Sequence, residues 1–539
     1  MDPVNYFEPV PRPIPRRSGP LPPGNTALST ANPSNRRGAP RWNMNYCQSL
    51  FELPASHLGK SAFHELDTGA HMTFGELQQA VLRWSANLQA RGIRSGDTVA
   101  IHLYNGLDFV VAHMAAQYIG AVSCLLDPLA QAKSLPYFLA KTSAKFLFTN
   151  LAPEQIPAEA SALSEIVAPS HFAIEASNLD LPTHATHPFG WSMDATCYVY
   201  FTSGTTSAPK GVELCQANHE NFYKIADKYW QPSGEASKHI AFVPFSHGFG
   251  SIFLIPWTIR TRSELHILRS FHPGKVVEAI ERIGITHIYG VPSHYQQLLR
   301  FPQYHETLKK LEMAFCAAAK LESQTVDEWK LVTGTRLHEG YGLIETTGGV
   351  VWRVHQDADR TGHVGECPDP SLIEIGILDE NGNVLAAGEE GEIAVRGKSV
   401  MKGYLDQPDE NARVFHDGWF RTGDKGLVDK NRQLFMTGRI KDIINIAGIK
   451  ISPFEVEAVL NDHPEVDNSV VVAAEDKLYG EVVKAFIVLK SGASASERDL
   501  IRYAGQHLIN FQVPKQIEFV SSFPLNNMGK VDRKALRSS

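Results

Sequence analysis

The sequence has few cysteines, no excess of basic residues and no long uninterrupted hydrophobic run, and each shortage argues against a class of protein. Its six cysteines are scattered over 539 residues without a C-x-x-C pair, and its histidines do not cluster at metal-ligand spacing. This pattern is typical of a cytoplasmic protein in a reducing environment, without a zinc site. The net charge of -7 supplies no basic field for nucleic acid or for an acidic membrane surface. A small molecule is therefore the expected partner.

The most apolar segment of the chain, Phe109 to Leu126, is too broken to span a membrane. His113, Gln117 and Gly120 interrupt it, so it predicts buried core and no membrane span. Residues 1–45 are rich in proline and arginine and offer little apolar surface for burial, which predicts a disordered arm. Its prolines also interrupt any apolar run of the kind that a secretory signal needs.

Residues 46–438 alternate between strand-like and helix-like patterns. A strand is expected at Thr98 to Tyr104, a helix at Leu107 to Tyr118, and a short buried strand at Gly120 to Leu126. This βαβ order is typical of parallel sheets. It predicts the α/β fold class, with one large N-terminal α/β domain that contains parallel-type sheets.

Residues 439–539 have the pattern of a second, smaller α+β domain of ordinary domain size. Ser452 and Glu455 have the spacing of a capping box that begins a helix, as do Thr73 and Glu76 in the larger domain. The other elements expected in the smaller domain are strands at Ser469 to Ala473 and Lys484 to Leu489 and a helix near Glu497 to Leu508.

A polar loop that ends in lysine follows the β-prone run Tyr198 to Phe201. Its glycine lets backbone N–H groups approach a polyphosphate, its hydroxyls donate hydrogen bonds, and its lysine supplies the opposite charge. A Walker A loop is excluded because Pro209 precedes Lys210 and Gly211 follows it. Residue chemistry alone leaves a Ser/Thr-rich surface turn as the alternative. The loop comprises Thr202, Ser203, Gly204, Thr205, Thr206, Ser207, Ala208, Pro209, Lys210 and Gly211.

This loop resembles the phosphate-binding signature of the adenylate-forming, or AMP-binding, superfamily. The superfamily contains acyl-CoA synthetases, peptide-synthetase adenylation domains and firefly-type luciferases, and the resemblance is closest to the acyl-CoA synthetases. It covers the chain from about Tyr46 onward, with several motifs in the family's order. The further motifs are Tyr341 to Glu345, Gly391 to Ile393, Phe420 to Asp424, Gly438 to Asp442 and Asn527 to Lys530.

The resemblance implies that ATP binds between these motifs. Glu345 would bind Mg²⁺, a hard cation that prefers carboxylate oxygen. Tyr341 would stack on adenine, Asp424 would accept hydrogen bonds from the ribose hydroxyls with help from Arg439, and Lys530 would bridge the carboxylate and the α-phosphate. The other implied nucleotide-binding residues are Thr202, Ser203, Gly204, Thr205, Thr206, Lys210, Ala318 and Gly342.

The resemblance also implies a second step, in which a thiol attacks the acyl-AMP after the small, mobile C-terminal domain has turned. Lys441 occupies the position of the hinge residue, and Gly448 and Ile449 would face the thiol arm of CoA or of a phosphopantetheine. His247 lies in an aromatic-His motif that would organise the carboxylate and the thiol entrance, as a catalytic residue beside Lys530.

Two features bear on activity and on the choice of acid. Ile344 stands where the family usually has threonine, and isoleucine cannot donate a hydrogen bond or bind Mg²⁺, so Thr346 or a water would substitute or adenylation would be slower. No Asp lies between Pro244 and Ile255 to bind an ammonium group. The apolar residues of that segment, which favour an apolar or aryl acid, are Phe249, Ile252, Phe253 and Leu254.

The sequence thus predicts an ATP- and Mg²⁺-dependent acid–thiol ligase that converts a small carboxylic acid to acyl-AMP and pyrophosphate and then transfers the acyl group to CoA. One alternative is a freestanding enzyme that loads the phosphopantetheine of a carrier protein. Another is a weakened acyl-adenylate-binding protein, an alternative motivated by Ile344.

Overall fold

The computed structural model describes most of the chain beyond residue 45. The described residues are 46–130, 132–163, 165–167, 192–202, 209–229, 234–319, 321–353, 362–446, 449–476, 479–526 and 529–537. The predicted arm at 1–45 lies outside them, as do residues 203–208 of the predicted phosphate loop. None of the helices formed by the described residues is long and apolar enough to cross a membrane.

A seven-stranded sheet carries the two ends of the predicted phosphate loop. Its strand order is β18-β8-β7-β4-β3-β5-β6, and β7, β4, β3, β5 and β6 run parallel. Strand β8 returns antiparallel to β7, with Lys210 directly opposite Thr202. The bounds are β3 Thr98–His102, β4 Val122–Leu125, β5 Phe146–Thr149, β6 Glu165–Val167, β7 Thr196–Thr202, β8 Lys210–Cys215 and β18 Gly403–Tyr404.

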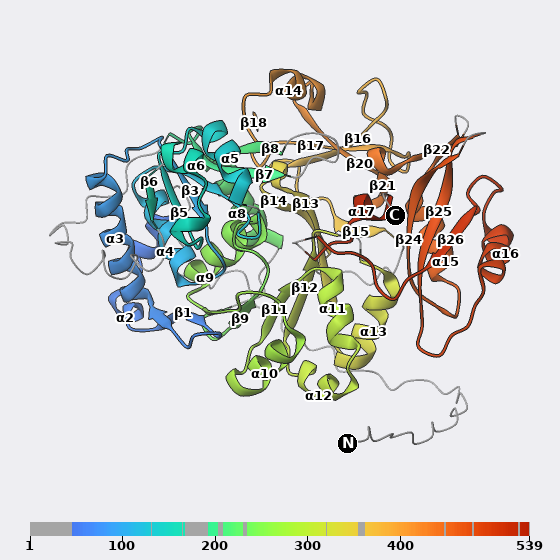
Figure 1. Cartoon of the computed structure of the whole chain (residues 1–539), viewed down its shortest axis with the longest axis horizontal. Helices are drawn as coiled ribbons and strands as arrows, with labels where there is room; N and C mark the ends of the chain where they lie inside the picture. Colours follow the sequence, from blue (N-terminus) through green and yellow to red (C-terminus); the bar gives the residue numbers. More distant parts are fainter. Residues whose placement is uncertain are drawn as a thin grey trace. The chain divides into compact units, whose positions relative to one another are not determined.

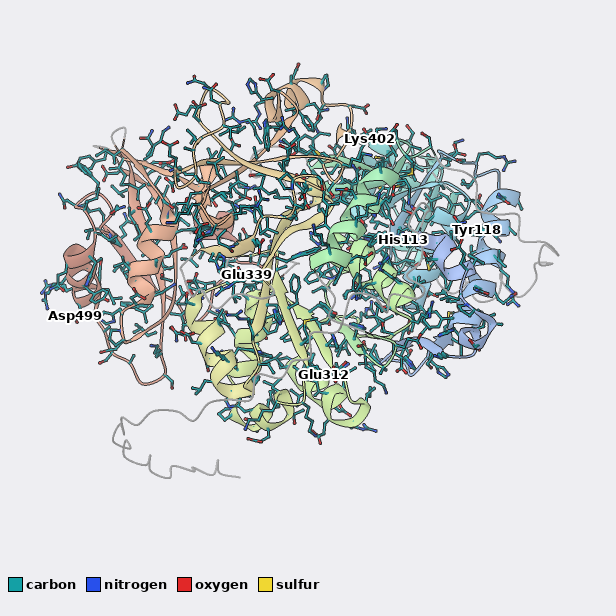
Figure 2. The ribbon with its side chains drawn as sticks, turned by 180° about the vertical axis from the view of Figure 1, so that it is seen from behind. His113, Tyr118, Glu312, Glu339, Lys402 and Asp499 are labelled. Carbon is teal, nitrogen blue, oxygen red and sulfur yellow. The ribbon has the colours of Figure 1, made fainter. Side chains whose placement is uncertain are left out.

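The predicted βαβ unit is present in this sheet. Helix α4 (Leu107–Tyr118) connects β3 to β4, and its residues are almost all buried. Two of them, His113 and Tyr118, are labelled in Figure 2. The predicted capping box at the start of α3 (Phe74–Ala90) is confirmed. The Thr73 hydroxyl accepts from the Glu76 N–H at 3.2 Å, and the Glu76 carboxylate accepts from the Thr73 N–H at 2.8 Å.

A larger, fourteen-stranded sheet brings together residues that are far apart in the sequence (Figure 1). Its main order is β16-β17-β20-β21-β15-β14-β13-β12-β11-β9-β10-β1-β2, with β19 paired to β20. The neighbouring strands β13, β12, β11, β9, β10 and β1 run parallel to one another. The edge strand β2 is antiparallel to β1. The bounds are β1 Ser61–Glu65, β2 His71–Thr73, β9 Lys238–Ala241, β10 Glu264–Ile267, β11 His287–Gly290, β12 Met313–Ala317, β13 Leu337–Leu343, β14 Gly348–Arg353, β15 His363–Glu366, β16 Glu374–Leu378, β17 Gly391–Arg396, β19 Phe415–His416, β20 Trp419–Val428 and β21 Gln433–Arg439.

Helices alternate with the strands of both sheets, as the sequence pattern indicates. The remaining α-helices that the described residues form before residue 440 are α1 Tyr46–Phe51, α2 Ala55–Leu58, α5 Leu135–Thr142, α6 Ala158–Leu163, α8 Gln216–Tyr229, α9 Ile255–Thr261, α10 Pro273–Ile283, α11 Pro292–Leu299, α12 His305–Leu308, α13 Ser323–Thr333 and α14 Pro408–Val414. Three short helical turns also enter the site: η4 Phe249–Leu254, η6 Ile344–Thr346 and η7 Ile440–Asp442.

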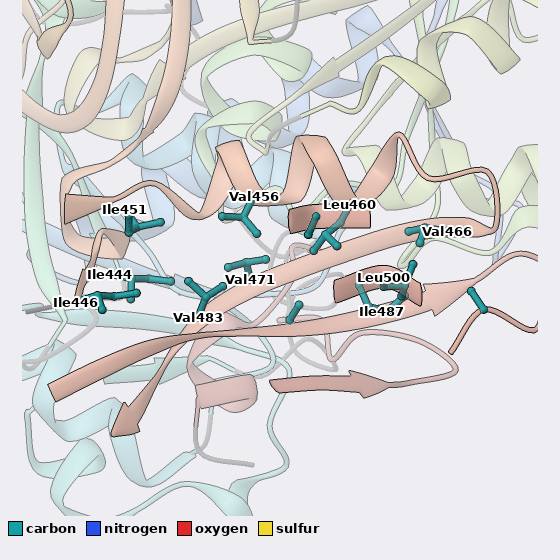
Figure 3. Packing of buried hydrophobic residues seen from close by; sticks show 13 residues of the cluster. Ile444, Ile446, Ile451, Val456, Leu460, Val466, Val471, Val483, Ile487 and Leu500 are labelled. Atoms are coloured by element: carbon teal, nitrogen blue, oxygen red, sulfur yellow. The ribbon is translucent and has the colours of Figure 1, made fainter. Parts of the chain in front are cut away.

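The C-terminal domain has a hydrophobic core of its own, formed between α15 and the β24–β25 pair (Figure 3). Val456 and Leu460 of α15 pack with Val471, Val483 and Leu500, and all five are buried. Burial of such a cluster lets the segment behave as a separate unit. The bounds are β22 Ile444–Ile446, β23 Ile449–Ile451, α15 Pro453–Asn461, β24 Val466–Asp476, β25 Gly480–Leu489, α16 Glu497–His507, β26 Gln516–Phe519 and α17 Arg533–Arg537.

One predicted capping box is wrong. Helix α15 begins at Pro453 as expected, but the Ser452 side chain makes no cap hydrogen bond. Its hydroxyl instead donates to the Thr437 carbonyl of β21 at 2.9 Å. The Glu455 side chain accepts from Gln512 at 2.6 Å. Tertiary partners have therefore taken both groups that the local motif would use.

Candidate functional site

A pocket of about 960 Å³ receives residues from both large sheets and from the C-terminal domain. It brings together ten of the residues that the sequence predicts for the site: Thr202, Lys210, His247, Ala318, Gly342, Glu345, Asp424, Arg439, Lys441 and Lys530. Tyr341 lines an adjoining cavity with Asp424, Arg439 and Lys530. Ile449 lies in neither lining and packs against the C-terminal core instead. Ser203, Gly204, Thr205, Thr206 and Gly448 lie outside the described residues.

Lys210 has a carboxylate partner within the chain. It begins β8, where pairing with Thr202 fixes both ends of the polar loop. Its ammonium forms an ion pair with Glu410 of α14 and lies 4.9 Å from the centre of the Tyr404 ring. Both charged side chains are less than one-fifth exposed. Glu410 is therefore paired with the ammonium that a phosphate would bind.

Glu345 has no cationic partner among the described side chains. One oxygen, Oε1, accepts from the Tyr404 hydroxyl at 3.0 Å. Burial raises the pKa of Glu345, because the carboxylate loses hydration here, and the more distant Arg439 charge only partly opposes that rise. A hard divalent cation would supply an opposite charge, so the carboxylate fits Mg²⁺.

Asp424 of β20 is held between a phenol and a guanidinium. Its Oδ2 accepts from the Tyr341 hydroxyl at 2.9 Å, and its Oδ1 lies 3.0 Å from Arg439 Nε. Arg439 is placed by sheet register, since it lies directly opposite Asp424 on β21. Burial raises the pKa of Asp424, and the Arg439 charge opposes that rise. Sequence reasoning missed the hydrogen bond from Tyr341, which orients the carboxylate.

Lys530 approaches the pocket on a tight turn. The Asn526 side chain accepts from the Lys530 N–H at 3.1 Å, and Ser293 donates to the Gly529 carbonyl at 2.7 Å. Gly529 has a φ of 73°, and a Cβ there would lie 3.2 Å from His294, so glycine suits this turn for two reasons. Burial and the Arg439 charge lower the pKa of Lys530 to about 8.

His247 is a neutral imidazole in this pocket. Burial, with a smaller contribution from the Lys530 charge, lowers its pKa to about 3. Its Nδ1 accepts from the Phe249 N–H at 3.4 Å. The ring can therefore accept or donate a hydrogen bond but does not carry charge at neutral pH.

Ile344 makes an apolar contact where a hydroxyl was expected. It is buried on η6, and a Cβ built on Gly248 would lie 2.8 Å from its Cδ1. Thr346 does not replace the missing hydroxyl. It is fully buried, with its Oγ1 bonded to the Leu343 N–H at 2.9 Å and to the Gly348 carbonyl at 3.1 Å.

The other end of the pocket is aromatic. Phe249 and Phe253 of η4 line it, as the sequence indicates, together with Phe222, Phe315 and Trp352. Phe222 meets Trp352 edge to face at 6.1 Å between ring centres. Sequence reasoning missed Phe222, Phe315 and Trp352 because they come from α8, β12 and β14, which the tertiary fold alone brings together. Leu254 is buried outside the lining.

Comparison with known proteins agrees with this site. Residues 51–405 match the AMP-binding enzyme family, and residues 455–530 match the AMP-binding enzyme C-terminal domain. A long-chain-fatty-acid–CoA ligase from Bacillus subtilis is 30% identical over 508 residues, covering 87% of this chain and 90% of its own. A feruloyl-CoA synthase from Amycolatopsis is 29% identical over 472 residues, covering 87% and 94%. The crystal structure of ATP-bound MatB from Rhodopseudomonas palustris superposes with a TM-score of 0.84 at 27% identity, covering 92% of this chain and 98% of its own.

The two-domain α/β architecture, the pocket and these similarities define an adenylate-forming enzyme of the acyl-CoA ligase type. The chain belongs to the AMP-binding enzyme family. The sequence prediction of the family and of its fold class is thereby confirmed.

Proposed function

We propose that this enzyme activates a carboxylic acid with an apolar or aryl tail as its acyl-AMP and transfers the acyl group to CoA. The observation that carries the choice of acid is the aromatic end of the pocket, where Phe222, Phe249, Phe253, Phe315 and Trp352 contribute to one lining with Lys530. Such a lining favours an apolar tail through burial of apolar surface. An ammonium group would have no carboxylate from residues 244–255 to meet it.

In the first step, a carboxylate oxygen of the acid attacks the α-phosphorus of ATP and pyrophosphate leaves. Both reactants are anionic, so the enzyme acts mainly by positioning them and by neutralising charge. The Lys530 ammonium bridges the two anions, Lys210 binds the leaving phosphates after release from Glu410, and Asp424 accepts from the ribose hydroxyls. The polar loop at 202–206 donates further hydrogen bonds. The roles of Tyr341, Ala318 and Gly342 around adenine follow from the family resemblance.

Glu345 is the residue that would hold Mg²⁺. When bound, the ion would neutralise phosphate charge. The Glu345 carboxylate fits the ion because it is buried, accepts from a phenol at 3.0 Å and forms no ion pair with the described side chains.

In the second step, the CoA thiol attacks the acyl carbonyl, its proton is lost, and AMP leaves as the new thioester forms. Lys441 lies in η7, directly after the last strand shared with the large sheet, which is a suitable place for a hinge. The domain boundary at residues 438–439 belongs to this proposal, as do the thiol-facing roles of Gly448 and Ile449. Neutral His247 would order the carboxylate and the thiol entrance by hydrogen bonding. All six cysteines are buried, which suits the proposed cytoplasmic location.

An ATP–pyrophosphate exchange assay tests the proposed acid. Aryl acids and aliphatic acids should support exchange, and amino acids of matching side chain should support it at least about tenfold less, since they bring an unpaired ammonium into an apolar site. Preference for an amino acid would contradict the proposal. Offering CoA and a pantetheinylated carrier protein side by side then identifies the acceptor. Faster transfer to the carrier would replace CoA by the loading function.

A further inference from the structure

A second cluster of metal-ligating side chains lies at the edge of the large sheet that carries β1, β10 and β2. His64 of β1 is directly opposite His266 of β10, so the two rings share one face of the sheet. Glu264 precedes His266 by two residues and therefore shares that face. The potential ligand atoms of these three residues all lie within 4.8 Å of one another. Sequence spacing did not predict the group, because strand register unites distant positions.

Hydrogen bonding leaves ligand capacity unused in the cluster. The closest contact joins His266 Nε2 to Glu264 Oε2 at 3.2 Å, and His64 Nε2 lies 3.8 Å from the same oxygen. His64 Nε2 and His266 Nδ1 are buried and have no hydrogen-bond partner among the described residues. The His266 side chain is only 4% exposed. Buried polar atoms without partners are uncommon in stable folds, and a bound ion or water is one way in which such atoms are satisfied.

We infer that His64, Glu264 and His266 form a binding site for a divalent transition-metal ion of the zinc type. Two imidazoles and one carboxylate are the ligand set that Zn²⁺ and its neighbours accept, and they leave a fourth position open. His71 of β2 is a candidate for a further ligand. It lies directly opposite His64, with ring centres 5.8 Å apart. Water is the other candidate for that position.

The charge state of the imidazoles suits a metal. Burial lowers the pKa of His64, and burial together with the neighbouring His64 charge lowers that of His266 to about 3. These shifts favour the neutral form of each ring, which is the form that coordinates a metal. Strand register alone places the three side chains together, whatever the charge of the imidazoles.

Two features of the site limit its affinity. The His64 and His266 rings are stacked at 4.5 Å and 13°, so both must rotate about χ2 to direct nitrogens at one ion. Lys238 of β9 lies directly opposite Glu264, and its ammonium is 3.8 Å from the same carboxylate oxygen. Lys238 therefore competes with a cation for Glu264. Bound metal would cross-link the edge strands β1 and β10 and so would stabilise the folded domain.

Titration of the tag-free, full-length protein with Co²⁺ without nucleotide tests the site. Co²⁺ reports imidazole coordination by its visible absorption, and Zn²⁺ should displace it. We expect one equivalent of Co²⁺ to bind, and Zn²⁺ to raise the melting temperature. His64→Ala and the near-isosteric Glu264→Gln should each weaken Co²⁺ binding by more than about tenfold, the loss typical even for an outer-shell partner. His416→Ala, which removes an exposed imidazole elsewhere, is the matched control and should bind normally.

Lys238→Met provides a test in the opposite direction. Removing the competing ammonium should tighten Co²⁺ binding by at least about threefold, a result that a misfolded variant would not give. Absence of Co²⁺ absorption in the unmodified protein would overturn the inference. So would binding that His64→Ala and Glu264→Gln leave unchanged, because another of the 22 histidines would then be responsible. Failure of Lys238→Met to tighten binding would overturn the assignment of Glu264 as a ligand.

Discussion

Burial and the charges of Arg439, Lys441, Asp424 and Glu345 together determine the charge state of Lys530. Burial and Arg439 lower its pKa, while Asp424 and Glu345 raise it, and the result is a pKa of about 8 without nucleotide. Bound ATP would add negative charge beside the ammonium and raise that pKa. The motif identified this lysine in the sequence, but its electrostatic neighbours come from strands that only the fold brings together.

The pH dependence of adenylation should follow this ionisation. Below about pH 8 the ammonium is charged, so kcat/KM for ATP in pyrophosphate exchange should fall as pH rises through about 8. Lys530→Arg should flatten that limb because a guanidinium stays charged, and Lys530→Ala should lower kcat by about 10²- to 10³-fold. A limb that persists unchanged in Lys530→Arg would show that another group titrates.

Ile344→Thr should raise pyrophosphate release by at least about tenfold if the missing hydroxyl limits adenylation, since one such donor can contribute 10²- to 10³-fold. The apolar contact with Gly248 would weaken. Ile344→Val removes a methyl group without adding a hydroxyl, so it should leave the rate near that of the unmodified enzyme. An unchanged rate in Ile344→Thr would remove the motive for regarding this chain as a weakened binding protein.

The elements of the fold were more predictable than their partners. The helix predicted at Leu107 to Tyr118 has the same first and last residues in the structure. Its flanking strands and its apolar composition both indicated a buried helix there. The strand expected at Thr98 to Tyr104 ends at His102 instead. The capping box at Ser452 failed because β21 provides a better acceptor for the serine hydroxyl. Local signals set the type of element, and tertiary contacts decided how side chains at its ends were used.

Glu410 of helix α14 pairs with Lys210 of β8. Local sequence could not reveal this ion pair, because its partners lie on different elements. Glu410→Gln should free the lysine and lower the KM for ATP by about three- to tenfold, equivalent to about 0.6–1.4 kcal/mol, with kcat little changed. Asp406→Asn, which removes the partner of Lys141, is the control and should leave KM unchanged. A higher KM in Glu410→Gln would mean that Glu410 positions Lys210 for phosphate.

At the scale of the molecule, the ordered motifs predicted the family, but the sequence predicted only the part of the aromatic end of the pocket that Phe249 and Phe253 form. Phe222, Phe315 and Trp352 belong to no motif, and their meeting depends on the packing of α8 against the large sheet. The cluster of His64, Glu264 and His266 likewise belongs to no sequence motif and is assembled only by the fold. Register between parallel strands placed it, and no spacing in the sequence indicates that register.

Rotation of the C-terminal domain at Lys441 predicts a separation of the two half-reactions. Lys441→Pro restricts φ at the hinge and should slow thioester formation by at least about tenfold while pyrophosphate exchange changes less than threefold. Lys441→Ala removes the same charge with an unrestricted backbone, so it should retain most transfer to CoA. Equal losses in both half-reactions for Lys441→Pro would contradict a hinge at this residue.

The most direct measurement incubates the purified protein with ATP, Mg²⁺, CoA and a panel of aryl, aliphatic and amino acids, and quantifies AMP and acyl-CoA by mass spectrometry. We predict that AMP and acyl-CoA form in equal amounts with at least one aryl or aliphatic acid and with no amino acid. The absence of AMP with every acid in the panel would contradict the proposed activity.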